Sequence, residues 1–306
     1  MLLRDAKGGG LSMQITSAPI GIYDSGVGGL TVWLALKKLI RQDLLYYGDT
    51  AHIPYGDKSR EQILFYSHNI IRFFQEKKAR AVIAACNTSS ALALPALQVS
   101  MGIPLFGVIE PAVANAIAQT RNNKVGIIAT VGTVNSGSYQ SIFRRDASDV
   151  EVFAQGCPKL VPLIEAGQVQ GSAVDNALQE YIYPLLAAGI DTLVLGCTHY
   201  PFLLPAIVKL TGLNIKIVDP AWQTAKNVYE WLQKSSIPDK QETPMDQYWV
   251  SGSPNEFAQR ARQFLGFSLD AVGHHVQPEA QPSELKVFKG ELWSAWREDN
   301  NDQVEE

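Results

Sequence analysis

The chain has 306 residues, of which 46% are hydrophobic and 18% are charged, and its formal net charge at pH 7 is −4. This length favours two domains of ordinary size, and the small acidic excess gives no basic surface of the kind that binds nucleic acid. Three cysteines in a chain of this size argue against a disulfide framework and fit a reducing compartment, so we expect a cytoplasmic protein.

Residues 1–17 are expected to form a disordered leader. Arg4, Asp5 and Lys7 fall where a signal peptide has its apolar segment. No stretch of the chain reaches the ~18 uninterrupted apolar residues that a membrane helix requires. We therefore expect neither a secretion signal nor a membrane partner.

From residue 18 onward, short apolar runs alternate with longer amphipathic segments. In chain order, the patterns predict a strand and glycine-rich turn at 18–29, a helix at 30–41, a strand at 43–50, a helix at 59–79 and a strand at 79–87. Further strands are predicted at 124–130, 191–198 and 214–220, followed by a loop at 235–247 and a strand and helix at 248–266. This alternation predicts an α/β fold of mostly parallel sheets flanked by helices.

Two segments of the chain are similar to each other. ARAVIAACNTSSALALPAL (79–97) and IDTLVLGCTHYPFLLPAIV (190–208) both consist of an apolar strand, a small residue, a cysteine, polar residues and an apolar helix. Upstream of them, IGIYDSGVGG matches VGIIATVGTV. We interpret this as one α/β unit used twice, against the alternative of chance similarity. Because such proteins bind ligands at strand carboxyl ends and between domains, a pseudo-twofold arrangement would direct both cysteines into one cleft.

These two cysteines, Cys86 and Cys197, each end a strand and precede a predicted helix N-terminus. A helix N-terminus favours negative charge, which lowers the pKa of a thiol placed there, and its N–H groups suit a carboxylate ligand. A single free cysteine is more often a small buried residue, but a pair in matching contexts favours chemistry. Cys157 has no such partner and is expected to be structural. A zinc site from the three cysteines and His199 is disfavoured, because no short Cys-x₂-Cys pair is present.

Asp24-Ser25, after the first predicted strand, and His199, two residues after Cys197, are further candidate site groups. If their strands are neighbours, Asp24 would lie beside the strand that carries Cys86; the alternative is that Asp24 is a turn residue or a helix cap. His199 is a candidate general acid or base, a partner for a ligand carboxylate, or a cap. The turn after Asp24 lacks the last glycine of G-x-G-x-x-G, so a nicotinamide cofactor is not expected. The polar loop at 48–59 either lies over the cleft or is a plain turn.

Two thiols on opposite sides of one small ligand suggest a definite reaction. One thiolate removes a proton from a carbon, and the opposing thiol delivers a proton to the other face. This inverts a stereocentre without a redox change, a metal or a cofactor, and each turnover exchanges the protonation states of the two cysteines.

Seven motifs occur in a fixed order between residues 18 and 267: DSGVGGLTV, GDTAHIPYGDKS, AACNTSSALALPAL, GVIEPA, VPLIEAG, LGCTHYPFLLPAI and VDPA. Together they resemble the glutamate racemases of the aspartate/glutamate racemase superfamily. The resemblance implies two pseudosymmetric α/β domains, a first at 18–110 plus 222–267 and a second at 111–221, with the active site in the cleft between them. Residues 268–306 would form a C-terminal extension with a polar tail.

The same resemblance implies a function and a set of site residues. The function is cofactor-independent interconversion of L- and D-glutamate, which supplies D-glutamate for peptidoglycan, in an enzyme expected to be a homodimer. The cysteine at position 86 would take the α-proton from D-glutamate and the one at 197 from L-glutamate, assisted by Asp24, His199 and Glu165. The substrate would be held, with no metal, at Asp24, Ser25, Tyr55, Gly56, Asn87, Thr88, Thr130, Thr198 and His199.

Three alternatives remain open at this point. The nearest is a racemase for aspartate or another acidic amino acid on the same scaffold. The second is a single-thiol decarboxylase or hydrolase that uses one cysteine with His199 or Asp24. The third is a two-domain binding protein that closes on an amino acid without chemistry, although such a protein needs no paired thiols.

Overall fold

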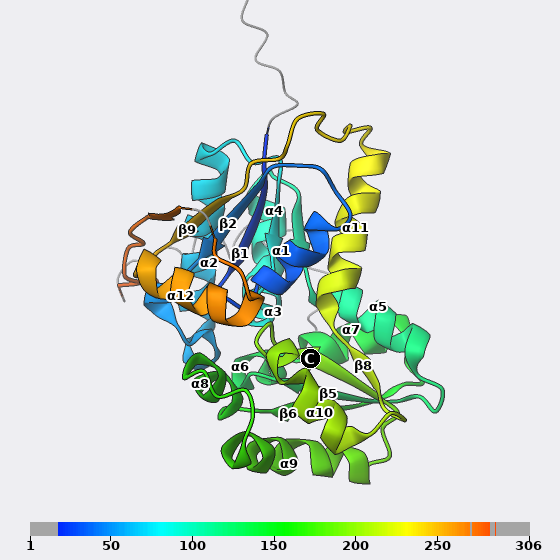
Figure 1. Ribbon diagram of the computed structural model, residues 1–306. Coiled ribbons are helices and arrows are strands. Elements are labelled where there is room, and N and C mark those ends of the chain that lie inside the picture. Colours follow the sequence, from blue (N-terminus) through cyan, green and yellow to red (C-terminus); the bar gives the residue numbers. More distant parts are fainter. Residues whose placement is uncertain (1–17, 270, 282–284, 286–306) are drawn as a thin grey trace, which may run out of the picture.

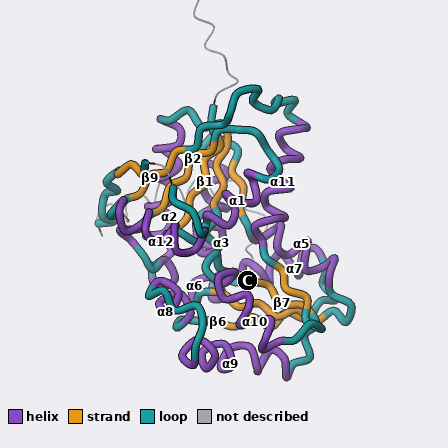
Figure 2. Tube along the Cα trace, in the orientation of Figure 1, coloured by secondary structure: helices purple, strands orange, loops and turns teal. Residues whose placement is uncertain are grey.

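The computed structural model describes residues 18–269, 271–281 and 285, and the expected leader at 1–17 lies outside them. In this part of the chain the strands form two separate sheets (Figures 1 and 2) in which every neighbouring pair is parallel. The strands are β1 (Ile20–Asp24), β2 (Leu44–Gly48), β3 (Ala81–Ala84), β4 (Leu105–Gly107), β5 (Lys124–Ala129), β6 (Glu151–Gly156), β7 (Thr192–Gly196), β8 (Lys216–Val218), β9 (Gln247–Val250) and β10 (Val272–His274).

Helices cover both sheets (Figure 1). They are α1 (Leu30–Lys37), α2 (Arg60–Glu76), α3 (Asn87–Leu92), α4 (Leu94–Ser100), α5 (Ile109–Gln119), α6 (Val131–Asn135), α7 (Ser138–Asp146), α8 (Leu160–Glu165), α9 (Ser172–Ala187), α10 (Leu204–Thr211), α11 (Pro220–Lys234) and α12 (Pro254–Leu265), with short 3₁₀ turns η2 (Thr50–His52), η3 (Tyr55–Asp57) and η4 (Tyr200–Leu203). No helix in the described residues has the length and apolar character needed to cross a membrane.

The two sheets share one strand order, which confirms the internal repeat. The larger sheet runs β10-β9-β2-β1-β3-β4 and the smaller runs β6-β5-β7-β8. Four consecutive strands of each sheet therefore occupy the order second, first, third, fourth, with β1 equivalent to β5 and β3 equivalent to β7. We call the part around β1–β4, β9 and β10 the first lobe and the part around β5–β8 the second lobe. In the view of Figure 1 they stand one above the other.

Local sequence explains why these segments fold as they do. β1, β2, β3 and β7 are buried along their whole length, as expected for strands covered on both faces. Helix α2 begins at a capping box in which the Ser59 side chain accepts from the Gln62 N–H and the Gln62 side chain accepts from the Ser59 N–H. One face of α2 then buries apolar residues such as Ile63, Ile70 and Phe74 against the first sheet.

The chain returns to the first lobe after the second lobe is complete. Helix α11 packs on α1, and β9 pairs with β2. Strand β10 lies within the expected extension at 268–306 and extends the first sheet by pairing with β9. This strand is only three residues long, too short to show an alternating pattern in sequence. Most of the expected polar tail lies outside the described residues, and the domain boundaries stay a prediction.

Candidate active site

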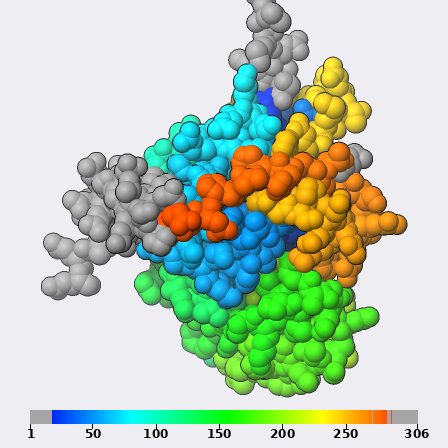
Figure 3. All heavy atoms as spheres, turned by 90° about the vertical axis from the view of Figure 1, so that its left-hand side faces the viewer, coloured from blue at the N-terminus to red at the C-terminus, as the bar shows by residue number. Residues whose placement is uncertain are grey.

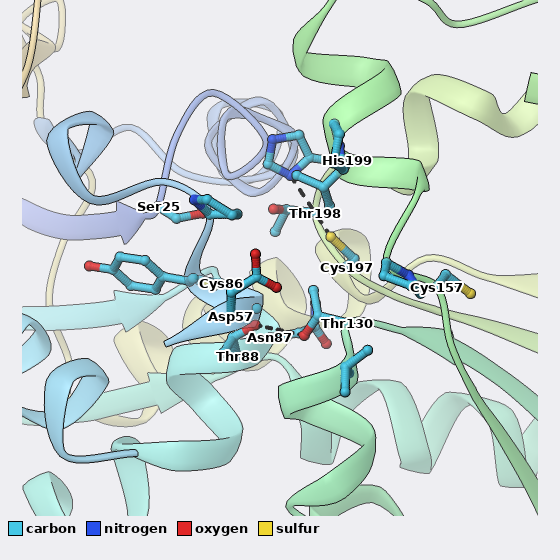
Figure 4. A pocket seen from close by; sticks show the side chains of 17 residues that line it. Ser25, Asp57, Cys86, Asn87, Thr88, Thr130, Cys157, Cys197, Thr198 and His199 are labelled. Atoms are coloured by element: carbon cyan, nitrogen blue, oxygen red, sulfur yellow. Dashed lines mark hydrogen bonds between the residues drawn. The ribbon is translucent and has the colours of Figure 1, made fainter. Parts of the chain in front are cut away.

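The carboxyl ends of equivalent strands from the two sheets meet at one pocket (Figure 4). Cys86 follows β3, and Cys197 follows the equivalent strand β7. Residues from the first lobe lie on one side of the pocket, and Thr130, Cys197, Thr198 and His199 lie on the other. The pocket is lined by Ser25, Pro54, Tyr55, Gly56, Asp57, Cys86, Asn87, Thr88, Thr130, Val131, Cys157, Pro158, Val161, Pro162, Cys197, Thr198 and His199.

The Cys86 thiol is buried and its pKa is raised to about 12. Burial is the main cause, and the negative charge of Asp24 and of Cys197 adds to it. The sequence-based expectation of a lowered pKa is therefore wrong for this residue, because burial outweighs the N-terminus of the six-residue helix α3.

Asp24 is completely buried and ties the two lobes together. Its Oδ2 accepts hydrogen bonds from the N–H groups of Gly26 (3.1 Å) and Gly29 (3.0 Å). Its Oδ1 accepts from the Thr198 hydroxyl of the second lobe at 3.1 Å. Gly28 makes this approach possible, because a Cβ there would lie 2.4 Å from the Thr198 Oγ1. β1 pairs with β3, so Asp24 lies beside the strand leading to the first thiol, which is one of the alternatives that the sequence left open.

A chain of polar contacts leads away from Cys197. The His199 Nδ1 lies 3.8 Å from the Cys197 Sγ. The His199 Nε2 lies 2.6 Å from Oε1 of Glu165, which is the last residue of α8. The other carboxylate oxygen of Glu165 accepts a hydrogen bond from the Arg260 guanidinium of α12. Only Cys197 and His199 of these four line the pocket, so Glu165 and Arg260 stand behind them.

The same contacts set the charge of His199. Burial alone would lower its pKa, but the hydrogen bonds to Cys197 and Glu165 raise the pKa of His199 to about 10. Burial likewise opposes ionisation of Glu165, yet His199 and Arg260 lower its pKa below the usual value. At neutral pH the imidazole is therefore protonated. Cys197 has a positive neighbour, whereas Cys86 has the negative Asp24 as its neighbour.

Hydroxyl groups cluster on the floor of the pocket where the lobes meet. The Thr88 Oγ1 lies 3.0 Å from that of Thr130 and 3.3 Å from that of Thr133, and the last two are 2.9 Å apart. Thr130 also caps α6 by accepting from the Thr133 N–H. Gly56 packs directly on Thr130, since a Cβ at this position would lie 3.0 Å from the Thr130 Cβ. Hydroxyls of this kind suit a carboxylate ligand.

Three further contacts fix side chains on the first lobe's side of the pocket. The Tyr139 hydroxyl of α7 donates to Oδ1 of Asn87 at 2.7 Å, which leaves the Asn87 amide N–H₂ as the free donor. The Tyr55 hydroxyl donates to Asp49 at 2.5 Å, and the same carboxylate lies 2.8 Å from Nδ1 of His52. The Tyr55 hydroxyl is thus engaged away from the pocket, so this residue lines it through its other atoms.

Most of the residues predicted from sequence lie around this pocket. Cys86, Cys197, Ser25, Tyr55, Gly56, Asn87, Thr88, Thr130, Thr198 and His199 line it, whereas Asp24 and Glu165 lie behind it. Sequence reasoning missed Pro54, Asp57, Val131, Cys157, Pro158, Val161 and Pro162. Cys157 follows β6, which pairs with β5, so its position at a strand end was an available signal. Its Sγ donates to the Gln155 carbonyl (3.4 Å), and burial raises its pKa.

The described residues hold no group of three His, Cys, Asp or Glu side chains arranged to bind a metal ion. The site offers the chemistry of its thiols and of the charged groups behind them. Two buried thiols from opposite lobes share one pocket with hydroxyl, amide and imidazolium donors. Such a site can bind an anionic ligand and exchange protons with it from two sides.

Known proteins resemble this chain in sequence and in structure. Residues 34–228 match the model of the Asp/Glu/Hydantoin racemase family. A glutamate racemase from Corynebacterium diphtheriae is 42% identical over 254 residues, covering 82% of this chain and 96% of that protein. A glutamate racemase isoform from Bacillus anthracis superposes with a TM-score of 0.81 at 32% identity, covering 86% of this chain and 98% of that chain.

A further solved structure carries a ligand. The glutamate racemase from Francisella tularensis, in complex with D-glutamate, superposes with a TM-score of 0.79 at 32% identity and covers 86% of this chain and 98% of that chain. The residues matched by the family model, 34–228, include both strand-end cysteines. The chain therefore belongs to the Asp/Glu/Hydantoin racemase family.

Proposed function

We propose that the protein is a glutamate racemase that interconverts L- and D-glutamate by a two-base mechanism using Cys86 and Cys197, without a cofactor. The observation that carries the proposal is the pocket itself: two thiols from equivalent strand ends of a duplicated fold line it together. Relatives that are about 40% identical along most of the chain are glutamate racemases.

The proposed reaction balances without a redox partner. From L-glutamate, the Cys197 thiolate takes the α-proton, and the electron pair of the Cα–H bond moves onto the α-carboxylate. The Cys86 thiol then gives its proton to the opposite face of Cα, which yields D-glutamate. Cys86 is left as the thiolate and Cys197 as the thiol, so the reverse reaction from D-glutamate restores the first state.

The groups around the thiols have distinct proposed roles. The protonated His199, held by Glu165, places positive charge near the Cys197 Sγ and thereby stabilises negative charge there. Asp24 holds the turn and the Thr198 hydroxyl in position. The proposed donors to the substrate carboxylates are the side chains of Ser25, Asn87, Thr88, Thr130 and Thr198. The loop with Tyr55 and Gly56 closes one side of the pocket.

The proposal is tested with the purified chain in D₂O. L-Glutamate is expected to acquire deuterium at Cα and to become racemic, and neither Cys86→Ala nor Cys197→Ala is expected to racemise it. Cys197→Ala retains the thiol proposed to act on D-glutamate, so this variant is expected to exchange the α-proton of D-glutamate without inverting it. Full racemisation by either variant would refute the two-base mechanism and favour a single-thiol enzyme.

The same assay separates the remaining alternatives. Turnover of L-aspartate but not of L-glutamate would show that the substrate is aspartate. Absence of α-proton exchange with either amino acid would favour a binding protein. We further propose that the enzyme acts in the cytoplasm as a homodimer and supplies D-glutamate for peptidoglycan. Sedimentation equilibrium tests the dimer, and rescue by D-glutamate of cells depleted of the enzyme tests the supply role.

A further inference from the structure

Helix α12 has one face in the first lobe and another on the second. Its N-terminus is fixed by the Ser253 side chain, which accepts from the Glu256 N–H at 3.4 Å. Phe257 and Ala261, one helical turn apart, are almost fully buried in the core of the first lobe. Phe257 also stacks on Tyr46 of β2, with ring centroids 5.8 Å apart. The helix is therefore anchored to the first lobe.

The neighbouring face of α12 carries three contacts to the second lobe. Arg260 pairs with Glu165 at the end of α8. Gln263 lies against Gly167, where a Cβ would be 2.9 Å from the Gln263 Nε2. Phe264 stacks on Phe202 of η4 with centroids 4.2 Å apart and an interplanar angle of 17°. Positions i, i+3 and i+4 share one face of a helix, so these contacts form a single stripe. Figure 3 shows this part of the chain, in orange, next to the second lobe in green.

Both ends of this stripe reach the segment that carries His199. Phe202 lies three residues after His199, and the Phe202 N–H donates to the His199 carbonyl at 3.1 Å. Glu165 holds the His199 ring directly, with its Oε1 2.6 Å from Nε2. One Glu165 oxygen is thus occupied by His199 and the other by Arg260. The carboxylate cannot rotate away from the imidazole without losing the guanidinium.

We propose that Arg260 is a positioning residue: from α12 it fixes Glu165 and so sets the orientation of His199 beside Cys197. This inference rests on the proposed two-thiol racemase and extends it to a residue outside the pocket. Its effect is expected to fall mainly on Cys197, because the His199 ring that Glu165 holds lies 3.8 Å from the Cys197 Sγ. Removing the ion pair between Arg260 and Glu165 should therefore slow proton transfer at Cys197 more than at Cys86.

The test uses the full chain with Arg260→Gln and Arg260→Lys, and Arg262→Gln as the matched control. Arg262 lies on the same helix but is exposed to solvent. Arg260→Gln is expected to lower kcat/KM about ten- to a hundredfold, the scale of a misplaced catalytic group. Arg260→Lys keeps a cation on a similar stem and is expected to recover part of the loss. Arg262→Gln is expected to match the unmodified chain, and melting temperatures show whether each variant is folded.

A second readout separates positioning from a general loosening of the lobes. Enantiomers have equal free energy, so kcat/KM must be equal in the two directions for every variant, which checks the assay internally. The isotope effect with α-deuterated substrate has no such constraint. In Arg260→Gln it is expected to rise for L-glutamate, whose α-deuteron Cys197 removes, and to fall or stay unchanged for D-glutamate.

Other outcomes would refute either the positioning role of Arg260 or the proposed function. Unchanged kcat/KM in Arg260→Gln would overturn the positioning role, and so would isotope effects that change equally for the two enantiomers. If Arg260→Gln does not fold, Arg260→Met, which keeps a long side chain but removes the charge, carries the same comparison, and unchanged isotope effects with unchanged kcat/KM in that variant would overturn the role. Failure of the unmodified chain to exchange the α-proton at all would instead refute the proposed function.

Discussion

Replacing Glu165 by glutamine should lower the pKa of His199. The carboxylate lies 2.6 Å from Nε2 and helps to raise the pKa of His199 to about 10. A hydrogen bond to a charged group contributes about 1.5–3 kcal/mol, and about 1.4 kcal/mol corresponds to one pH unit. Glutamine keeps an acceptor oxygen but loses the negative charge. The His199 pKa in Glu165→Gln is therefore expected to fall from about 10 to about 8 or 9.

The assay is an NMR titration of the chain labelled in the histidine rings. The chain has five histidines, and the His199 signal is the one that is lost in His199→Asn. Glu180→Gln is the matched control, because Glu180 pairs with Lys159 on the surface. A His199 signal that titrates at the same pH in Glu165→Gln and in the unmodified chain would refute the electrostatic role of Glu165.

The same change should alter how stability depends on pH. A histidine whose pKa is raised on folding stabilises the folded state fully below its unfolded pKa near 6.5. That stabilisation is lost as the pH rises through about 10, the value for His199. The difference in unfolding free energy between the unmodified chain and Glu165→Gln, measured by urea denaturation, is therefore expected to be larger at pH 6 than at pH 10.5. A difference that grows with pH would contradict this reasoning.

Three further predictions concern the pocket. Tyr139→Phe removes the hydrogen bond to Asn87 Oδ1 and leaves a buried acceptor unpaired, so urea denaturation should show a loss of about 1–3 kcal/mol and steady-state kinetics a higher KM. Gly28→Ala places a Cβ on Thr198 and should cost about 1–3 kcal/mol in the same denaturation assay, whereas an unchanged unfolding midpoint would show that the lobes can separate freely there. Alkylation of Cys86 by iodoacetamide, followed by mass spectrometry of its peptide, should be slow at pH 8 and accelerate up to about pH 12, and rapid alkylation at pH 7 would contradict the raised pKa.

The features that depend on local pattern were predictable from the sequence. The apolar runs before Cys86 and Cys197 are buried strands, and their repeated context corresponds to a repeated strand order in space. Parallel pairing was also expected from that pattern, whereas the sequence left open whether β1 neighbours β3, the pairing that places Asp24 near the first thiol. Such features are readable because burial on both faces of a parallel sheet leaves a continuous apolar run.

The features that depend on tertiary contacts were not predictable. The contacts from His199 through Glu165 to Arg260 join the residue before η4 to α8 and α12, which no periodicity in the chain connects. The pKa of Cys86 depends on how deeply the thiol is buried, and the sequence shows only the helix that follows it. Cys157 was expected to be structural because it lacks a repeat partner, yet a strand end places it in the pocket wall.

The return of the chain to the first sheet has a consequence for synthesis. β2 is buried along its length and pairs with β1 on one side and with β9 on the other. Until β9, at 247–250, has left the ribosome, β2 presents an open and apolar edge. The strands of the second lobe, β5–β8, are by contrast contiguous at 124–218 and available earlier. Domains fold as units during synthesis, so the second lobe is complete first, and a chain that ends before β9 exposes an edge prone to aggregation.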